Sequence, residues 1–192
     1  MPSTSYQEWT TSRSKALDEM AQAHAAVGGN ERGRRYATQQ INRSYAVLLA
    51  SQFQGFCRDL HSECVDNLVR SLTPASLQPV VRAEFTLNRQ LDSKNAQPAS
   101  IGSDFGRLGI DFWTQVAALD AANPTRKTVL DRLNAWRNAI VHQNFDPAKL
   151  GGTKTLHLKD VKLWRRDCGY LARSFDTVMR THIHSLTGVF PW

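Results

Sequence analysis

The apolar residues of this chain recur at three- and four-residue steps along most of its length, a spacing typical of helices. The longest such stripe predicts a helix over residues 34–72. Its members are Ile41, Tyr45, Leu48, Leu49, Gln52, Phe56, Leu60, Cys64, Leu68 and Leu72. A second long stripe follows Asp160, a predicted N-cap, and extends through Leu186. Two stripes of this length predict the spine of a helical bundle.

Capping and breaking residues divide the rest of the N-terminal half into helices. Ser5 and Glu8 fit a capping box and predict a helix that ends at Gly28. The sequence Thr-Pro-Ala-Ser at residues 73–76 ends the long helix. A shorter helix is then predicted over residues 77–90.

Polar caps also place the helices of the C-terminal half. Asp111 is a predicted N-cap for a helix that runs through Ala121. Asn123 as N-cap and Pro124 in the first turn predict the most strongly marked helix, over residues 124–144.

Three segments lack a helical pattern. Residues 92–103 are polar and rich in turn formers, so we expect them to be the least structured part of the chain and a substrate-facing loop. Residues 155–158 predict a brief extended segment. The tail at residues 188–192 is apolar enough to dock on the rest of the protein.

Together these elements predict an all-α fold, a single-domain helical bundle of about five main helices. Residues 1–30 are expected to form an N-terminal helix or arm, and residues 31–192 the main helical domain. Gly55 in the middle of the long helix costs up to about 1 kcal/mol against alanine, which a close approach of another helix would offset.

The charge of the chain indicates polyanionic partners. Its 192 residues include 24 Lys and Arg against 17 Asp and Glu, which gives a net charge of +7. Basic side chains gather in two groups, one of Arg32, Arg34, Arg35 and Arg43 and one of Lys159, Lys162, Arg165 and Arg166. RNA contact and solvated helix faces are both open interpretations of these groups.

Cysteine usage and the apolar runs indicate a compartment. The three cysteines, Cys57, Cys64 and Cys168, each lie within a predicted helix, as expected for buried free thiols in a reducing compartment. The N-terminus lacks the pattern of a secretory signal, and the longest apolar run, residues 45–50, is too short to cross a membrane. We therefore expect a cytoplasmic protein without a membrane partner.

Candidate chemistry concentrates at the end of the helix over residues 124–144. The sequence has no metal-ligand spacing and no glycine-rich phosphate loop, so neither a metal nor a cofactor is expected. Arg137 falls within the apolar arc of this helix, whereas Asn138 and His142 share the neighbouring polar face. The predicted arc consists of Val129, Leu130, Leu133, Trp136, Ile140 and Val141.

These three polar residues fit RNA cleavage without a metal, because RNA carries its own nucleophile, the 2′-hydroxyl. The imidazole of His142 can transfer protons near neutral pH. The guanidinium of Arg137 can stabilise the charge that develops on the phosphate. Asn138 can bind the phosphate or orient the His142 ring.

The spacing leaves alternatives open. Arg137 and His142 lie about 140° apart around a regular helix, so the two side chains of one chain do not point in the same direction. The length of arginine, the helix end near His142, or a partner copy would each reconcile them. In a purely structural interpretation, Arg137 pairs with Asp59 or with Asp131 of a neighbouring copy, and His142 caps the helix C-terminus.

The Arg137-Asn138-x-x-x-His142 cluster resembles the signature of HEPN domains, an arginine followed after several residues by a histidine. The runs Leu87-Asn88-Arg89-Gln90, Ser51-Gln52-Phe53-Gln54-Gly55-Phe56 and Phe105-Gly106-Arg107-Leu108-Gly109-Ile110-Asp111 are similar to the prokaryotic RiboL-PSP-HEPN type. The resemblance covers about residues 36–185.

This resemblance implies a metal-independent endoribonuclease that leaves a 2′,3′-cyclic phosphate. It implies Arg137, His142 and Asn138 as catalytic residues, and a homodimer in which two copies of the motif form one composite site. It also implies a toxin–antitoxin or phage-defence setting, with an antitoxin protein as a further partner.

Substrate-binding residues are expected on the first long helix. Many family members carry an acidic residue where this chain has Gln54, and a glycine where it has Gln143. The Gln54 amide can bind phosphate or sugar but cannot act as a base. Arg58, Arg34 and Arg35 are further substrate-binding candidates. The alternative function is a non-catalytic helical module that binds RNA, a nucleotide or a partner protein.

Overall fold

The structure, a computed structural model, describes residues 1–28 and 35–192, and all regular secondary structure in these residues is helical. The elements are α1 (Thr4–Glu8), a π-helical segment η1 (Trp9–Arg13), α2 (Ser14–Gly28), α3 (Arg35–Leu72), α4 (Gln78–Thr86), α5 (Gln90–Ser93), α6 (Pro98–Gly106), α7 (Phe112–Leu119), α8 (Asn123–Val141) and α9 (Leu158–Thr187). The all-α prediction is confirmed. Four of these helices are long, α2, α3, α8 and α9, and the others are short.

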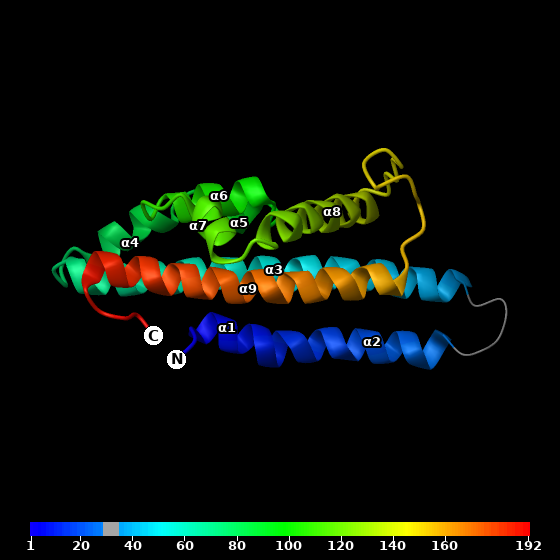
Figure 1. Ribbon diagram of the computed structural model, residues 1–192, viewed down its shortest axis with the longest axis horizontal. Helices are drawn as coiled ribbons and strands as arrows, with labels where there is room; N and C mark the ends of the chain where they lie inside the picture. Colours follow the sequence, from blue (N-terminus) through cyan, green and yellow to red (C-terminus); the bar gives the residue numbers. More distant parts are fainter. Residues whose placement is uncertain (29–34) are drawn as a thin grey trace.

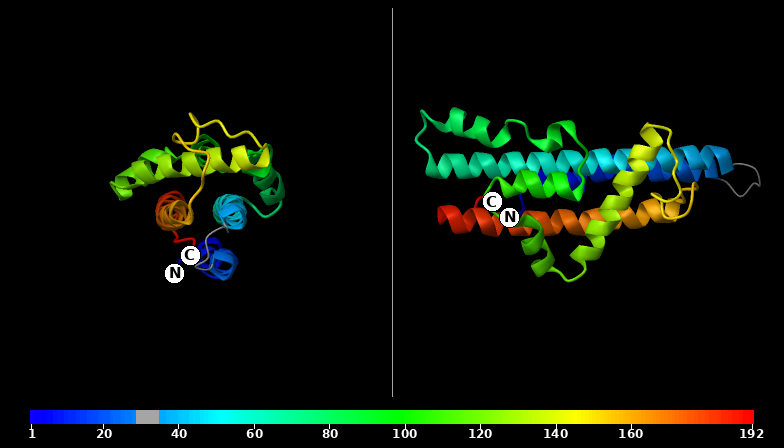
Figure 2. Two further views of the ribbon diagram at one scale, coloured as in Figure 1. Left: turned by 90° about the vertical axis from the view of Figure 1, so that its right-hand side faces the viewer. Right: turned by 90° about the horizontal axis from the view of Figure 1, so that it is seen from above.

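The long helices α3 and α9 lie side by side in the middle of the molecule and run in the same direction (Figure 1). The segment α1–η1–α2 lies along one side of this pair, and α4–α8 cover the opposite side. Seen from above, α8 crosses the pair obliquely, and its C-terminal end reaches beyond α3 (Figure 2). This arrangement leaves the end of α8 open to solvent.

The core lies where α3 and α9 meet the layer of short helices. Five phenylalanines there are almost completely buried, and they are Phe53, Phe56, Phe105, Phe112 and Phe175. The Phe105 and Phe112 rings stack with centroids 4.4 Å apart, and Phe175 meets Phe112 edge to face at 4.8 Å. Offset and edge-to-face pairs of this kind stabilise a core beyond the burial of their area.

The first helix begins two residues earlier than the capping box predicts. Its N-cap is Ser3, whose hydroxyl accepts from the Tyr6 N–H at 3.0 Å. Ser5 instead donates its hydroxyl to Glu63 of α3 at 2.8 Å. The prediction of Ser5 as N-cap is wrong, because a partner distant in sequence takes its side chain.

Two further predicted caps are wrong, and one is confirmed. Asn123 is buried and donates to the Val116 carbonyl at 2.8 Å and to the Ser174 hydroxyl at 3.0 Å, so it joins α8 to α7 and α9 rather than capping. Asp160 lies in the first turn of α9, whose N-cap is His157. Asp111 caps α7 as predicted.

The helix predicted over residues 77–90 is interrupted. α4 ends at Thr86, Asn88 takes a positive φ of 57°, and α5 begins at Gln90. The polar segment at residues 92–103 is also more ordered than expected, because α6 begins at Pro98 and Gln54 donates to carbonyls of the preceding turn. Its prediction as the least structured part of the chain is therefore wrong.

The N-terminal helices and the C-terminal tail are both held against the bundle. Arg165 of α9 donates to Asp18 at 2.7 Å and to the Ser14 hydroxyl at 2.7 Å, so it holds α2 rather than facing solvent. The Phe190 ring stacks on His184, with Arg180 over the same ring, and the predicted docking of the tail is confirmed. Among the residues described, no helix has the length and apolar character needed to cross a membrane.

Candidate functional site

The site is built on α8, whose buried face holds it in place. Leu130, Leu133 and Trp136 are almost completely buried against the α3–α9 pair. Asn134, also buried, donates to the Ala96 carbonyl at 2.9 Å, which joins α8 to the turn before α6. The last turn of α8 therefore projects from a rigid base, as a catalytic or binding side chain requires.

The side-chain amide of Asn138 is fixed by two donors. Its Oδ1 accepts from Asn95 Nδ2 at 2.6 Å and from Arg137 Nη1 at 3.2 Å. Since guanidinium only donates, these contacts assign the oxygen and place the amide nitrogen on the other side. Asn138 thus has an amide N–H₂ group available to an acceptor outside the protein. Asn95 was not predicted, although it lies in the polar segment that was expected to face substrate.

Arg137 is half-buried and forms no ion pair with a carboxylate within the described part of the chain. Its predicted partner Asp59 binds Arg13 instead, with Nη2 and Oδ2 2.5 Å apart. The interpretation that Arg137 pairs with Asp59 is therefore wrong. A half-buried guanidinium without a carboxylate is suited to an anionic ligand.

His142 is exposed at the point where α8 ends. It is the C-cap residue, and its backbone N–H donates to the Asn138 carbonyl at 2.9 Å. The next residue, Gln143, takes a left-handed φ of 53°, which stops the helix. No side-chain hydrogen bond of His142 occurs in residues 1–28 and 35–192, so its ring is open to a ligand.

Asn138 and His142 line one cavity of about 480 Å³. Its other polar lining residues are Gln97, Asp131, Asn134, Asn144, Asp146 and Lys149. Arg137 is not among them, so the chain brings together two of the three predicted catalytic residues. Val141 was predicted to be buried but is 49% exposed, because the last turn of α8 reaches beyond α3 (Figure 2).

Asp131 lines the same cavity but lies too far from His142 for both side chains to contact one atom of a substrate. Burial raises the pKa of this carboxyl above its usual value, and Lys127 opposes the rise. Eleven residues separate Asp131 from His142, which is about 16 Å along a helix. Asp131 therefore belongs to the far end of the cavity.

The predicted substrate-binding residues lie apart from this cavity. Gln54 donates to the Leu91 and Lys94 carbonyls, both at 2.9 Å, so its amide supports the turn that carries Asn95. Arg58 is half-exposed on α3 beside Asp59. Arg34 lies outside the described residues. Arg35 is the first residue of α3, and nothing further is described of its side chain.

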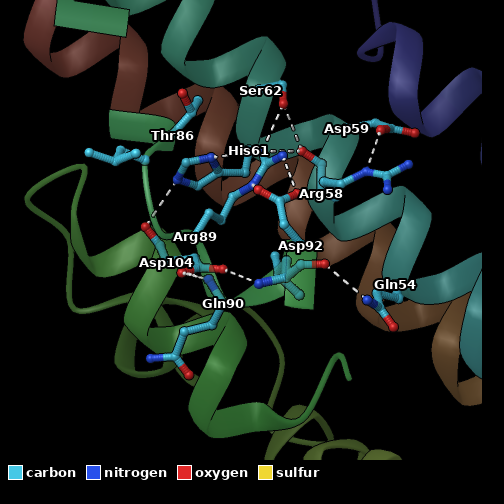
Figure 3. Close-up of polar contacts among 12 residues, drawn as sticks. Gln54, Arg58, Asp59, His61, Ser62, Thr86, Arg89, Gln90, Asp92 and Asp104 are labelled. Atoms are coloured by element: carbon cyan, nitrogen blue, oxygen red, sulfur yellow. Dashed lines mark hydrogen bonds and ion pairs between the residues drawn. The ribbon is translucent and has the colours of Figure 1, made fainter. Parts of the chain in front are cut away.

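A second polar cluster, which the sequence did not predict, surrounds Arg89 (Figure 3). This guanidinium is 8% exposed and donates to the Arg58 carbonyl at 3.0 Å and the Ser62 hydroxyl at 2.8 Å. It also pairs with Asp92, with Nη2 and Oδ1 2.8 Å apart. Arg89 thus joins α3 to α5. The available indication was its place in the run Leu87-Asn88-Arg89-Gln90.

His61 completes this cluster in its neutral form. Its Nε2 lies 3.1 Å from the Asp104 carbonyl, an acceptor, so the ring hydrogen is on Nε2. Burial, followed by the charge of Arg89, lowers the pKa of His61 to about 4. The Asp104 carboxylate accepts from the N–H groups of Gln90 and Leu91 at 2.9 and 2.8 Å, which caps α5. Every group of this cluster has an internal partner, as a structural role requires.

No group of three or more His, Cys, Asp or Glu side chains able to hold a metal ion occurs in the described ranges 1–28 and 35–192. No protein-family model, curated protein or solved structure matches the chain.

Proposed function

We propose that this protein is a metal-independent endoribonuclease of HEPN type whose active site lies at the C-terminal end of α8. The single observation that carries the proposal is the open cavity lined by both Asn138 and His142, next to Arg137, which has no carboxylate partner among the described residues. This combination offers a proton-transfer group, an amide donor and a permanent positive charge within the last two turns of α8.

The reaction requires two proton transfers. The 2′-oxygen forms a bond to phosphorus and releases its proton to a base, while the bond from phosphorus to the 5′-oxygen breaks and that oxygen takes up a proton. The products are a 2′,3′-cyclic phosphate and a 5′-hydroxyl. His142 can perform one of these transfers, and the Asn138 N–H₂ group can donate to a non-bridging phosphate oxygen.

A second copy of the chain supplies the rest of the proposed site. Arg137 does not line the cavity of its own chain, although it donates to the lining residue Asn138. A single histidine serves only one of the two transfers. In a homodimer with the ends of α8 facing each other, each copy adds an arginine and a histidine to the shared site. The exposure of His142 and Val141 supports this arrangement, because both side chains are free to meet a partner.

One backbone feature supports the HEPN resemblance. Family members often have glycine directly after the histidine, and here Gln143 stands at that position with a left-handed φ of 53°. Glycine adopts this conformation without steric cost. The departure in residue type is therefore compatible with the same helix end. The proposed setting, toxin–antitoxin or phage defence with an antitoxin partner, rests on the resemblance alone.

The second candidate function is a non-catalytic module that binds RNA. The observation that favours it is the absence of Arg137 from the cavity lining, since a chain that works alone would then lack the charge that stabilises the transition state.

The test is cleavage of end-labelled RNA in EDTA by the purified protein and by the His142→Ala, Arg137→Ala and Asn138→Ala variants. We expect fragments with a cyclic phosphate end, and a loss of at least about 100-fold in rate for His142→Ala and Arg137→Ala. Arg58→Ala is the matched control, because this half-exposed arginine lies outside the cavity. If the wild-type protein binds the RNA but leaves it intact, the result favours the non-catalytic module.

A further inference from the structure

A second cavity lies at the end of the molecule where α3 and α9 both begin (Figure 1). It has a volume of about 820 Å³ and is lined by the first turns of α3 and by residues 154–157, the segment that leads into α9. This segment is held in place by Asn42, which donates to the Leu156 carbonyl at 2.9 Å. The Gln39 amide also lies within hydrogen-bonding distance of both backbone groups of Leu156. The cavity thus has a fixed wall.

The charged residues that line this cavity are all basic. Arg43 comes from α3 and Lys154 from the loop, and no carboxylate belongs to the lining within residues 1–28 and 35–192. A different cavity, beside the N-terminal segment, is lined by four carboxylates, Glu8, Asp59, Glu63 and Asp66, and by one cation, Arg70. The two cavities favour opposite charges. A polyanion is therefore attracted to the Arg43 and Lys154 end of the molecule and repelled from the other.

The cavity also has the groups that recognise nucleotides. Tyr36 is 78% exposed at its edge, and an aromatic ring of this kind can stack on a base. Asn42, which is 6% exposed, lines the cavity, and its side-chain oxygen has no hydrogen-bond partner in the described part of the chain. A ribose hydroxyl and an exocyclic base amine are both hydrogen-bond donors, so either can supply the donor that this oxygen lacks.

The loop between α8 and α9 connects this cavity to the candidate active site. Residues 142–150 of the loop contribute to the active-site cavity, and residues 154–157 contribute to the basic one. Between them the Arg43 guanidinium lies 4.3 Å from the Phe145 ring centroid, and this ring contacts Trp136 of α8. A chain of nucleotides that lies over Phe145 can reach both cavities.

We propose that the basic cavity binds a single-stranded segment of the RNA substrate, with a base on Tyr36 and a phosphate at Lys154. This inference rests on the proposed ribonuclease function. It assigns substrate binding to the region of Tyr36, Arg43 and Lys154 rather than to Gln54 and Arg58. Single-stranded RNA fits better than a duplex, because stacking on an exposed tyrosine needs an unpaired base.

The experiment measures binding of a fluorescent single-stranded RNA of roughly twelve nucleotides, a length that one such groove can cover. Fluorescence anisotropy is recorded on the full chain carrying His142→Ala, which keeps the RNA intact, over a range of salt concentrations. The variants are Lys154→Glu and Tyr36→Ala, each added to this background. Lys15→Glu is the matched control, because Lys15 is exposed on α2 and lines neither cavity.

Each variant has its own expected result. Lys154→Glu weakens binding by about 10-fold or more and lowers the salt slope by about 0.7, the value for one lost phosphate contact. Tyr36→Ala weakens binding by about 10-fold with an unchanged salt slope, because stacking involves no counterion release. Lys15→Glu changes binding by less than about twofold.

Three outcomes overturn the inference. The first is an RNA affinity in Lys154→Glu and Tyr36→Ala that equals that of the His142→Ala protein. The second is a loss of affinity in Lys15→Glu as large as in these two variants. The third is a His142→Ala protein that does not bind the RNA. The result is separable from the test of the proposed function, because binding is measured without cleavage. The two proposals can therefore fail separately. If Lys154→Glu weakens RNA binding but cleavage survives His142→Ala, the basic cavity remains the RNA-binding site and the proposed active site is rejected.

Discussion

The protein contains two clusters that each include an arginine and a histidine, and the two clusters differ in their access to solvent. Around Arg89 and His61 every polar group has an internal partner, and both side chains are buried. At the end of α8, the Arg137 side chain donates to Asn138 and to no other group in residues 1–28 and 35–192, and the His142 ring is exposed. The same residue types thus form a structural joint in one place and an open site in the other.

This difference indicates how to recognise a functional cluster. A closed network restricts the protonation state of its histidine, and the lowered pKa of His61 follows from burial and from Arg89. An open cluster keeps donors and a titratable ring available for a ligand. The presence of an arginine and a histidine alone does not distinguish the two clusters, whereas the number of polar groups without an internal partner does.

The largest expected effect comes from breaking the closed cluster of Arg89 and His61. Arg89→Ala removes the donors to Asp92, Ser62 and the Arg58 carbonyl, and we expect a loss of about 3 kcal/mol in the free energy of unfolding. Urea unfolding followed by circular dichroism measures this loss. Arg58→Ala is the control and should cost less than about 1 kcal/mol, since its side chain is half-exposed. Equal losses in the two variants would contradict the assignment of Arg89 as a joint.

The second prediction concerns pH. Native His61 stays neutral down to about pH 4, whereas a histidine in the unfolded chain takes up a proton near pH 6.5. The unfolded state therefore binds more protons between these values. The free energy of unfolding falls by roughly 3 kcal/mol as the pH is lowered from about 6.5 to about 4.

Urea unfolding at several pH values measures this slope. The His61→Gln variant should lack this contribution, because glutamine does not titrate in this range. A wild-type slope that persists unchanged in His61→Gln would show that other groups cause it.

The third prediction tests the open cluster at the end of α8. Asn95→Ala removes one of the two donors that orient the Asn138 amide, so we expect RNA cleavage to slow about tenfold, or about 1.4 kcal/mol. The melting temperature should change little, because the loss of one half-buried hydrogen bond costs little stability. Lys94→Ala is the neighbouring control. A rate as slow in Lys94→Ala as in Asn95→Ala would indicate disturbance of the whole turn.

The smallest expected effect concerns a third arginine, Arg13, which is half-buried. A Cβ atom at Gly55 would lie 2.5 Å from Arg13 Nη1, so Gly55→Ala displaces this guanidinium from Gln52 and Asp59. Because alanine also favours the helix, we expect a net loss of only about 1 kcal/mol in unfolding free energy. Gly106→Ala is the control, with nothing within 4 Å, and should be neutral or slightly stabilising. A stabilised Gly55→Ala would mean that Arg13 adjusts freely.

The periodic stripes predicted the long helices, because burial of one face determines both the pattern and the packing. They did not predict which partners take individual polar side chains. Ser5 and Asn123 were predicted as caps, but Glu63 and Ser174, both distant in the sequence, bind them. The close approach at Gly55 was expected, but the group that fills it is the Arg13 side chain rather than a helix backbone.

For the candidate site, the sequence predicted the placement of Asn138 and His142 on one face, since both lie on the same helix four residues apart. It did not predict Asn95, which reaches Asn138 through a turn in space rather than along a helix. It also did not predict the Arg89 and His61 network, whose members come from three separate helices and turns. Contacts between elements of this kind have no periodicity in the sequence.

The most direct test of the difference between the two clusters is the reaction of histidines with diethyl pyrocarbonate, measured residue by residue by mass spectrometry. Modification requires an accessible, unprotonated ring nitrogen, and the His61 ring is buried whereas the His142 ring is exposed. The account predicts rapid modification of His142 that added RNA slows, and no modification of His61 in the folded protein. Modification of His61 as fast as that of His142 would contradict it.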